Sequence, residues 1–341
     1  MTVFSTICRI CNTEDNHPKF VGREMMFGTR DEFEYFQCIS CGCLQITDIP
    51  KNLDKYYPSE YSPHSIPKLD HKNKNLLVRI LQKQRCRTAL FGKYYKINTL
   101  LKLIVDLPAA LYSRPNEVSS VGRTVLTAGL KDFDEPILDV GCGIFSHWLA
   151  SLDELGFTQL QGVDPLIPSN QSQGHVRITK GELRDIPGKF SLITLHHSLE
   201  HIINQEEMMI QIAEHLNPDG VCLIRIPIVS SRVWEEYKTN WIEFDPPRHL
   251  YLHSLESLNF IAKKAGLEVY ETQYDTSAFE FYGSEMYARN ISWYDEDSPL
   301  TNPNSKLFSK EEMINFEKLA DIVNQSGHAG RAAFYLRKAR A

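Results

Sequence analysis

The sequence has no apolar run of about 18 residues, so it predicts no membrane-spanning helix. It also has no basic excess: 37 lysines and arginines stand against 43 acidic residues, a formal net charge of −6 that argues against a nucleic-acid-binding protein. The start, MTVFSTICRICN, has no basic stretch followed by an apolar core, so we expect no signal peptide and a cytoplasmic protein. In that compartment the eight cysteines are expected to be thiols or metal ligands.

The chain is long enough for one large domain or two ordinary ones, with 341 residues of which 42% are hydrophobic. We divide it into a cysteine-rich module at 1–50, a connector with basic amphipathic helices at 51–128 and a main domain at 129–341. Two stretches of the main domain, 228–253 and 283–328, are expected to be insertions. No internal repeat is present.

The main domain alternates strand-like and helix-like runs, which predicts an α/β fold with a mainly parallel sheet. Amphipathic helices with capping residues separate the strands. The predicted strands are residues 136–140, 160–164, 175–179, 190–196, 221–227, 267–274 and 331–339, and the predicted helices are 146–155, 204–216, 254–266 and 309–325.

The first predicted strand leads into a glycine loop, DVGCG. Gly141 and Gly143 allow a sharp turn and a close approach to a ligand. Asp139, just before the loop, would repel a pyrophosphate but suits a cationic ligand. Asp164 ends the second strand, where an acid can bind ribose hydroxyls. Together they fit an adenosine-like ligand with a positive charge, such as the sulfonium S-adenosylmethionine.

Five motifs make the prediction of the ligand more specific: ILDVGCG, GVDP, GELRDIP, HHSLEHI and LNPDGVCLIRIP. Their order and spacing over about 130–275 resemble class I S-adenosylmethionine-dependent methyltransferases of the type 23 and type 12 group, which is associated with bacterial polysaccharide and secondary-metabolite pathways. The resemblance implies a Rossmann-like, seven-stranded sheet flanked by helices, with the two insertions on the acceptor side. It implies these cofactor-binding residues: Asp139, Gly141, Cys142, Gly143, Asp164, Pro165, Glu182, Leu183 and His196.

The string LHHSLEHI ends the fourth predicted strand, where a methyl acceptor would lie. Three interpretations stay open. Glu200 and His201 cap and pack the next helix; or a histidine with a pKa near neutral is a general base; or the string holds a second divalent cation. The third rests on a resemblance to metal-dependent methyltransferases, and favours Mn²⁺, Fe²⁺ or Zn²⁺ over Mg²⁺. The candidate catalytic and second-metal residues are His197, Glu200, His201 and His249.

The segment VWEEYKTNWIEFDPPRHLYLH is rich in aromatic and polar side chains, which suits a sugar or phenol acceptor. Arg248 could pair with an acceptor phosphate or carboxylate, or with a structural acid. The candidate substrate-binding residues are Trp234, Trp241, Asp245, Arg248 and Tyr251.

Two CxxC pairs, Cys8/Cys11 and Cys38/Cys41, predict a structural zinc site in a zinc-ribbon-like module. Cys43 is a substitute ligand in this reading. Fifty residues bury little core, so the metal would supply much of the folding energy. The module resembles the N-terminal zinc-binding segment of sugar C-methyltransferases.

The favoured function is O-methylation of a sugar hydroxyl on a glycan or nucleotide sugar. The alternatives are C-methylation of a keto-sugar and O-methylation of a phenolic metabolite; the non-enzymatic alternative is a zinc-ribbon binding protein with a scaffold Rossmann-like domain. A small-molecule or saccharide acceptor and a homodimer are the expected partners, without nucleic acid. The basic helices at 72–107 are either a solvated face or a peripheral membrane contact.

Overall fold

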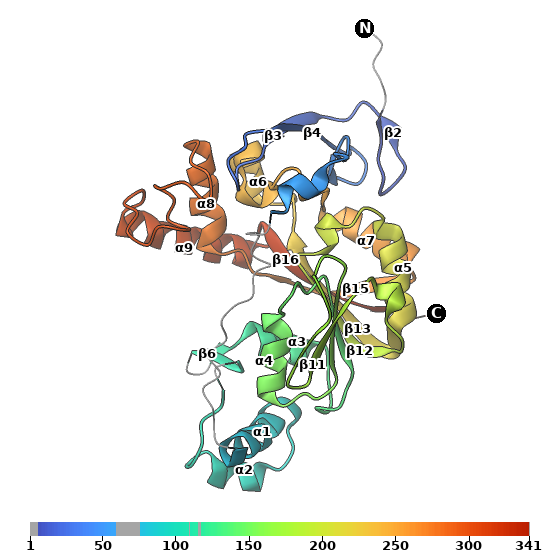
Figure 1. Ribbon diagram of the computed structural model, residues 1–341, viewed down its shortest axis with the longest axis vertical. Coiled ribbons are helices and arrows are strands. Elements are labelled where there is room, and N and C mark those ends of the chain that lie inside the picture. The colour runs from blue at the N-terminus through green and yellow to red at the C-terminus, as the bar shows by residue number, and fades with distance from the viewer. Residues whose placement is uncertain (1–5, 59–75, 109, 115–116, 341) are drawn as a thin grey trace.

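The computed structural model describes residues 6–58, 76–108, 110–114 and 117–340 (Figure 1). Its centre is an eight-stranded sheet with the order β10-β11-β9-β8-β12-β13-β16-β15. All neighbours from β11 to β13 are parallel, and β16 is antiparallel to both of its neighbours. The strands are β8 (Ile137–Val140), β9 (Leu160–Asp164), β10 (Gln171–Gln173), β11 (Val176–Lys180), β12 (Phe190–His196), β13 (Leu216–Pro227), β15 (Leu267–Tyr274) and β16 (Arg331–Lys338).

This sheet confirms the predicted α/β fold with a mainly parallel sheet, and all seven predicted strands are present. The eighth strand, β10, is a three-residue edge strand that pairs antiparallel with β11. It is too short and too polar to give a strand signal in the sequence. The strand order reverses between β8 and β12, and open parallel sheets bind ligands outside the carboxyl ends of the strands at such a point.

Helices cover both faces of the sheet (Figure 1). One face carries α3 (Ser120–Thr127) and α4 (His147–Leu155), and the other carries α5 (Gln205–His215) and α7 (Leu255–Lys264). The predicted caps are formed: the Ser146 hydroxyl accepts from Leu149 N at 3.0 Å, and the Asn204 side chain accepts from Glu207 N at 3.3 Å.

The remaining helices lie at the periphery. They are α1 (Leu76–Phe91), α2 (Tyr95–Leu101), α6 (Arg232–Tyr237), α8 (Ala278–Ala288) and α9 (Lys310–Ser326). Helices α1 and α2 fall within the predicted basic helical stretch, while residues 59–75 of the predicted connector lie outside the described residues. In the described part of the chain, no helix has the length and apolarity that crossing a membrane requires.

The N-terminal module shares a sheet with a distant part of the chain. Its strands β3 (Lys19–Arg23), β4 (Glu32–Gln37) and β5 (Leu44–Ile46) are joined by β14 (Tyr251–Leu252), in the order β14-β5-β4-β3. A further two-stranded sheet is formed by β1 (Thr6–Ile7) and β2 (Glu14–Asp15). The Tyr35 and Phe244 rings pack with centroids 4.6 Å apart. The module is therefore continuous with the segment that follows β13.

A buried ion-pair cluster fixes this junction. Arg248 and Glu24 are both fully buried, with Nη2 and Oε1 2.9 Å apart. Arg248 Nε also donates to Asp245 Oδ2 at 2.8 Å, and Nη1 donates to the carbonyl of Tyr56 at 3.2 Å. One guanidinium thus joins the N-terminal module, the start of the connector and the segment after β13.

We predict that Arg248→Ala lowers the free energy of unfolding by about 3–5 kcal/mol, because it leaves the buried Glu24 and the partly buried Asp245 without their cation. The matched control is Arg289→Ala, which breaks an exposed pair with Glu285 (2.9 Å) and should cost about 0–1 kcal/mol. Urea unfolding followed by tryptophan fluorescence measures both. Equal losses in the two variants would contradict the role given to the buried cluster.

Candidate active site

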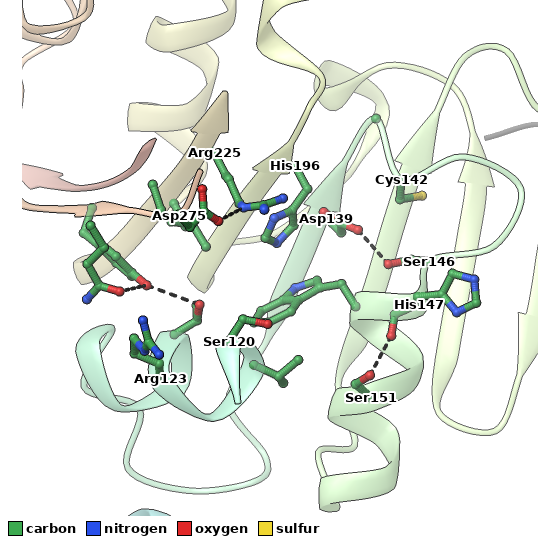
Figure 2. Close-up of a pocket in the computed structure, with 18 of the residues that line it drawn as sticks. Ser120, Arg123, Asp139, Cys142, Ser146, His147, Ser151, His196, Arg225 and Asp275 are labelled. Atoms are coloured by element: carbon green, nitrogen blue, oxygen red, sulfur yellow. Dashed lines mark hydrogen bonds and ion pairs between the residues drawn. The ribbon is translucent and has the colours of Figure 1, made fainter. Parts of the chain in front are cut away.

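A cavity of about 460 Å³ lies between helices α3 and α4 and the sheet (Figure 2). We name it the α3–α4 pocket. It reaches from the glycine loop after β8 to the outer strands β15 and β16. The lining residues include Ser120, Arg123, Thr124, Asp139, Gly141, Cys142, Phe145, Trp148, Ser151, His196, Arg225, Gln273, Asp275 and Tyr335. Its volume is typical of a small-molecule site.

Four of the predicted cofactor-binding residues line this pocket: Asp139, Gly141, Cys142 and His196. Gly141 has φ 72°, and a Cβ there would come within 2.5 Å of the Ser198 Cβ, so the turn requires glycine. The Asp139 carboxylate is held by hydroxyls, accepting from Ser146 at 2.7 Å and from Thr194 at 2.8 Å. Burial raises the pKa of the Asp139 carboxyl to about 6. A cationic ligand would offset this cost of burying its charge.

The other predicted cofactor residues lie beside the pocket, around the ends of β8, β9 and β11. Asp164 is buried, and its two oxygens accept from Gly143 N (2.9 Å) and Leu166 N (2.8 Å). Pro165 follows it directly. Glu182 is exposed and begins the short helix that contains the buried Leu183. Their roles in binding a ribose and an adenine stay predictions.

The string after β12 forms a compact cluster with His249. One ligand atom from each of Glu200, His201 and His249 lies within 4.8 Å of the others. The backbone brings the segments together, since Leu250 N donates to the carbonyl of Glu200 at 2.8 Å. Glu200 is fully buried, and among the described residues neither of its carboxylate oxygens has a hydrogen-bond partner. Burial raises its pKa well above the usual range.

Both histidines of this cluster have one ring nitrogen fixed by a carbonyl. His201 Nδ1 lies 2.9 Å from the carbonyl oxygen of Arg248, and His249 Nδ1 lies 2.7 Å from that of Glu243. A carbonyl only accepts, so each Nδ1 carries the proton and each Nε2 keeps its lone pair. This arrangement is typical of metal-ligating histidines. Two imidazoles and one carboxylate with open positions fit Zn²⁺ or Fe²⁺.

His197 does not complete this ligand set, contrary to the prediction. Arg225 Nη1 donates to His197 Nε2 at 3.0 Å, which uses the lone pair of that nitrogen. The other nitrogen, Nδ1, must then carry a proton and lies 3.4 Å from Glu200 Oε1. His197 therefore presents an N–H on the side of the carboxylate, but the two groups form no hydrogen bond. Its backbone has φ 50°, which turns the chain away from the strand.

The pKa values also bear on the general-base interpretation. Burial lowers the pKa of His196 and of His201 to about 3, and that of His197 well below its usual value. Burial therefore makes these three residues weaker bases than a free imidazole, and the general-base interpretation stays a prediction. They are neutral at physiological pH, which is the form that binds a metal.

Arg225 is a site residue that the sequence analysis missed. It lines the pocket beside His196 and forms a close ion pair with Asp275, which in turn accepts from Arg331 Nε at 3.0 Å (Figure 2). The contacts Arg225–His197–Glu200 connect the pocket to the histidine cluster. The available signal was a lone arginine within the apolar strand VCLIRIP, but the sequence could not show its partners.

The predicted substrate-binding residues lie elsewhere, and none lines the α3–α4 pocket. Trp234 and Trp241 are buried in the core. Arg248 has the alternative role considered above: it is fully buried and paired with the structural acids Glu24 and Asp245. The hydroxyl of buried Tyr251 donates to the carbonyl of Ile203 at 2.9 Å.

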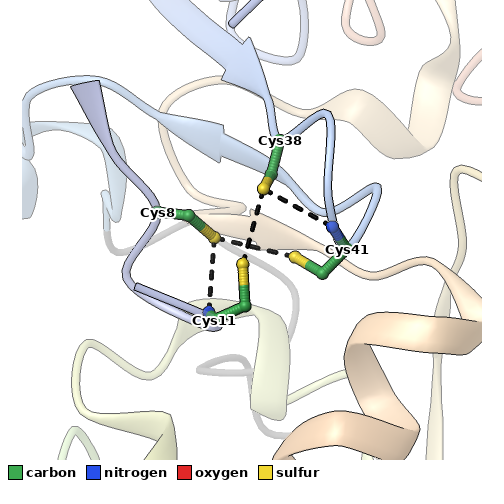
Figure 3. A group of neighbouring side chains, drawn as sticks. All are labelled: Cys8, Cys11, Cys38 and Cys41. Atoms are coloured by element: carbon green, nitrogen blue, oxygen red, sulfur yellow. Dashed lines mark hydrogen bonds between the residues drawn. The ribbon is translucent and has the colours of Figure 1, made fainter. Parts of the chain in front are cut away.

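The four cysteines of the N-terminal module converge (Figure 3). The sulfurs of Cys8 and Cys41 are 3.6 Å apart, those of Cys11 and Cys38 are 3.5 Å apart, and all four lie within 4.8 Å of one another. A tetrahedral zinc ion with Zn–S bonds of about 2.3 Å separates its sulfurs by roughly 3.8 Å. Cys43 lies outside the group. The cluster thus fits the predicted structural zinc site.

Residues 113–272 match the model of a family described as a methyltransferase domain. A comparison with curated proteins finds no match. Solved structures with a similar fold include the mitomycin 7-O-methyltransferase, at 13% identity over 62% of this chain and 52% of that chain, with a TM-score of 0.39.

Two further similar structures come from named organisms. The phosphoethanolamine N-methyltransferase 2 of Haemonchus contortus, in complex with S-adenosylmethionine, is 18% identical over 67% of this chain and 54% of that chain (TM-score 0.40). A methyltransferase of Archaeoglobus fulgidus is 17% identical over 60% and 86% (TM-score 0.39). The match spans about half the length of the first two structures, and none of the three identifies an acceptor. The family match thus identifies a methyltransferase domain over residues 113–272, a little under half of the chain.

We predict that S-adenosylmethionine binds more weakly as the pH falls through about 6. Asp139 is ionised above its pKa of about 6 and protonated below it, so acid removes the charge that faces a cationic ligand. The loss should approach tenfold per pH unit. Calorimetric titration at pH 5–7 measures it, with Asp139→Asn as control, whose affinity should be weaker and independent of pH in this range. A wild-type affinity that does not change with pH would contradict the assignment.

We also predict that Cys11→Ser loses about one equivalent of zinc per chain and much of the stability of the N-terminal module, since metal binding and folding are coupled in such sites. Elemental analysis and thermal unfolding measure this. Cys43→Ala is the matched control and should retain that equivalent. Purified protein without zinc, together with an unchanged Cys11→Ser variant, would rule the site out.

Proposed function

We propose that the protein transfers a methyl group from S-adenosylmethionine to a hydroxyl of a sugar, on a glycan or a nucleotide sugar, and that a divalent cation held by Glu200, His201 and His249 assists the transfer. We infer the cation from the buried Glu200 carboxylate, whose oxygens have no hydrogen-bond partner among the described residues. A buried carboxylate in this state is stable only when it is protonated or bound to a cation. Such an ion would polarise an acceptor hydroxyl that reaches it from the α3–α4 pocket, to which the contacts Arg225–His197–Glu200 connect the cluster.

The lining of the α3–α4 pocket supports a saccharide acceptor. Hydroxyl and amide groups from Ser120, Thr124, Ser151 and Gln273 line it together with the ring of Trp148. Sugars combine hydroxyls with an apolar ring face, and an aromatic wall with several hydrogen-bonding groups suits both.

Arg123 supports a nucleotide sugar within this class. It is exposed at the pocket, and among the described residues it forms no ion pair. A free guanidinium can bind a phosphate through two parallel hydrogen bonds. C-methylation of a keto-sugar and O-methylation of a phenol remain the alternative reactions in the same pocket.

The chain's own residues would orient the reaction. His197 Nδ1 lies 3.4 Å from Glu200 Oε1, and Arg225 fixes the tautomer of His197 from the pocket side. Asp139 offers a negative charge to the cationic end of the cofactor. The side chains of Trp148 and His196 pack with ring centroids 5.0 Å apart and cover the sheet below the cofactor loop.

The acceptor is tested by a methyl-transfer assay with labelled S-adenosylmethionine against nucleotide sugars, free oligosaccharides and phenols. The proposal expects label on a nucleotide sugar or oligosaccharide. Label on phenols alone would show that the acceptor is a phenol instead of a sugar. Tight cofactor binding without transfer to any acceptor would instead favour a scaffold domain.

We predict that Glu200→Gln and His249→Ala each lower turnover by about 10²-fold or more and leave cofactor affinity nearly unchanged. Glu200→Gln keeps the shape of the side chain and removes the charge that a cation requires. The control is His175→Ala, since His175 pairs with Asp153 on the surface away from the pocket and its loss should leave turnover intact.

Chelation distinguishes a metal-binding role of this cluster from a purely structural one. Brief treatment with EDTA should abolish turnover, and one divalent ion should restore it, while metal analysis shows that the slowly exchanging four-cysteine site keeps its zinc. Full activity after the cluster has lost its ion would remove the cation from the proposal. Full activity in both variants would reduce the cluster to a structural role.

A further inference from the structure

The helical segment that packs on α1 exposes an apolar surface. We name residues 93–104, which comprise α2 and its flanking turns, the α2 tip. It presents six large apolar side chains that are each between 50% and 80% exposed: Tyr94, Tyr95, Ile97, Leu100, Leu103 and Ile104. Soluble proteins seldom leave such a contiguous apolar group uncovered without a partner.

Specific contacts hold the tip on α1, so the exposed apolar side chains belong to an ordered part of the fold. Leu101 is buried against the rest of the fold. Arg85 of α1 donates from Nε to the Asn98 side chain at 3.4 Å and from Nη1 to the carbonyl of Val105. These contacts orient one side of α2 inward and leave its apolar side chains outward.

The charged residues of α1 and the tip are all cations. Between residues 76 and 105 the chain has the cations Arg79, Lys83, Arg85, Arg87, Lys93, Lys96 and Lys102 and no aspartate or glutamate, although the whole protein has a net charge of −6. Lys96 and Lys102 lie among the apolar residues, are exposed, and form no ion pair within the part of the chain that the structure describes. Asp106 borders the tip, and Asp132 is already paired with Lys93 and Arg87.

The combination of exposed apolar side chains and cations indicates which kind of partner the tip binds. A second copy of the tip would bring like charges together, which opposes self-association. Nucleic acid would use the cations but not the exposed leucines and isoleucines. A bilayer with anionic lipids uses both, because aliphatic side chains enter the interface while lysines contact the headgroups and tyrosines lie at the boundary. We propose that the α2 tip docks the protein on an anionic membrane surface.

The position of the tip gives this contact a consequence. Helix α1 packs against α3 and α4, the two helices that line the α3–α4 pocket, and the tip lies at the end of the molecule opposite the N-terminal module (Figure 1). Docking at the tip therefore holds this end of the molecule against the bilayer, with the N-terminal module on the far side.

The surface is tested without cofactor or acceptor, so its failure is distinct from a failure of the proposed function. Co-sedimentation uses vesicles of phosphatidylcholine with 30% phosphatidylglycerol, compared with pure phosphatidylcholine. The proposal expects binding to the anionic vesicles only, weakened by salt. The double variant Leu103→Asp/Ile104→Asp should bind at least about 50-fold more weakly, since it loses two apolar insertions. Lys96→Gln/Lys102→Gln should lose about fivefold per lysine.

The matched control is Ile314→Asp/Ile322→Asp, which makes the same change at two exposed isoleucines of α9 and should bind like the wild type. No binding to anionic vesicles, or equal loss in the control, would overturn the proposal. So would a shift from dimer to monomer in the tip variant in the absence of vesicles, which would assign the tip to a second copy of the chain. A fall in melting temperature confined to the tip variant would show instead that the chain itself covers the tip.

Discussion

The buried pairing of Arg248 with Glu24 and Asp245 is the constraint on which the rest of the site depends. A guanidinium without solvent must have each of its donors satisfied, and here the acceptors come from three separate segments of the chain. The backbone on either side of this residue is thereby fixed. Its carbonyl orients His201, and the next residue is His249. The N-terminal module therefore positions the histidine cluster, although it contributes no side chain to it.

A second consequence follows for the cysteine site. Zinc in a closed four-thiolate site has no open coordination position, so its effect is structural. By ordering β3, β4 and β5 it would order the strand β14 and the segment that carries Arg248 and His249. The cysteine module and the segment that carries the histidine cluster are then one structural unit, joined through a shared sheet and a shared ion pair.

The fold was largely predictable, because strands buried on both faces and capped amphipathic helices leave strong local patterns. The edge strand β10 was not, since three polar residues carry no such pattern. Asp139 and Gly141 were found from the loop sequence, and Glu200, His201 and His249 from residue type. The pocket role of Arg225 and the core positions of Trp234 and Trp241 were missed, because burial and partner choice depend on contacts between distant segments. Aromatic content alone could not distinguish a core from an acceptor wall.

The central claim is that the cofactor and the histidine cluster serve one reaction centre. The most direct test is a crystal structure with S-adenosylhomocysteine, with anomalous scattering recorded at the absorption edges of the bound metals. The account predicts the homocysteine end beside Asp139 in the α3–α4 pocket, one metal peak among the four cysteines, and a second peak between Glu200, His201 and His249. A ligand bound outside this pocket, or a cluster without a metal peak at full metal loading, would contradict it.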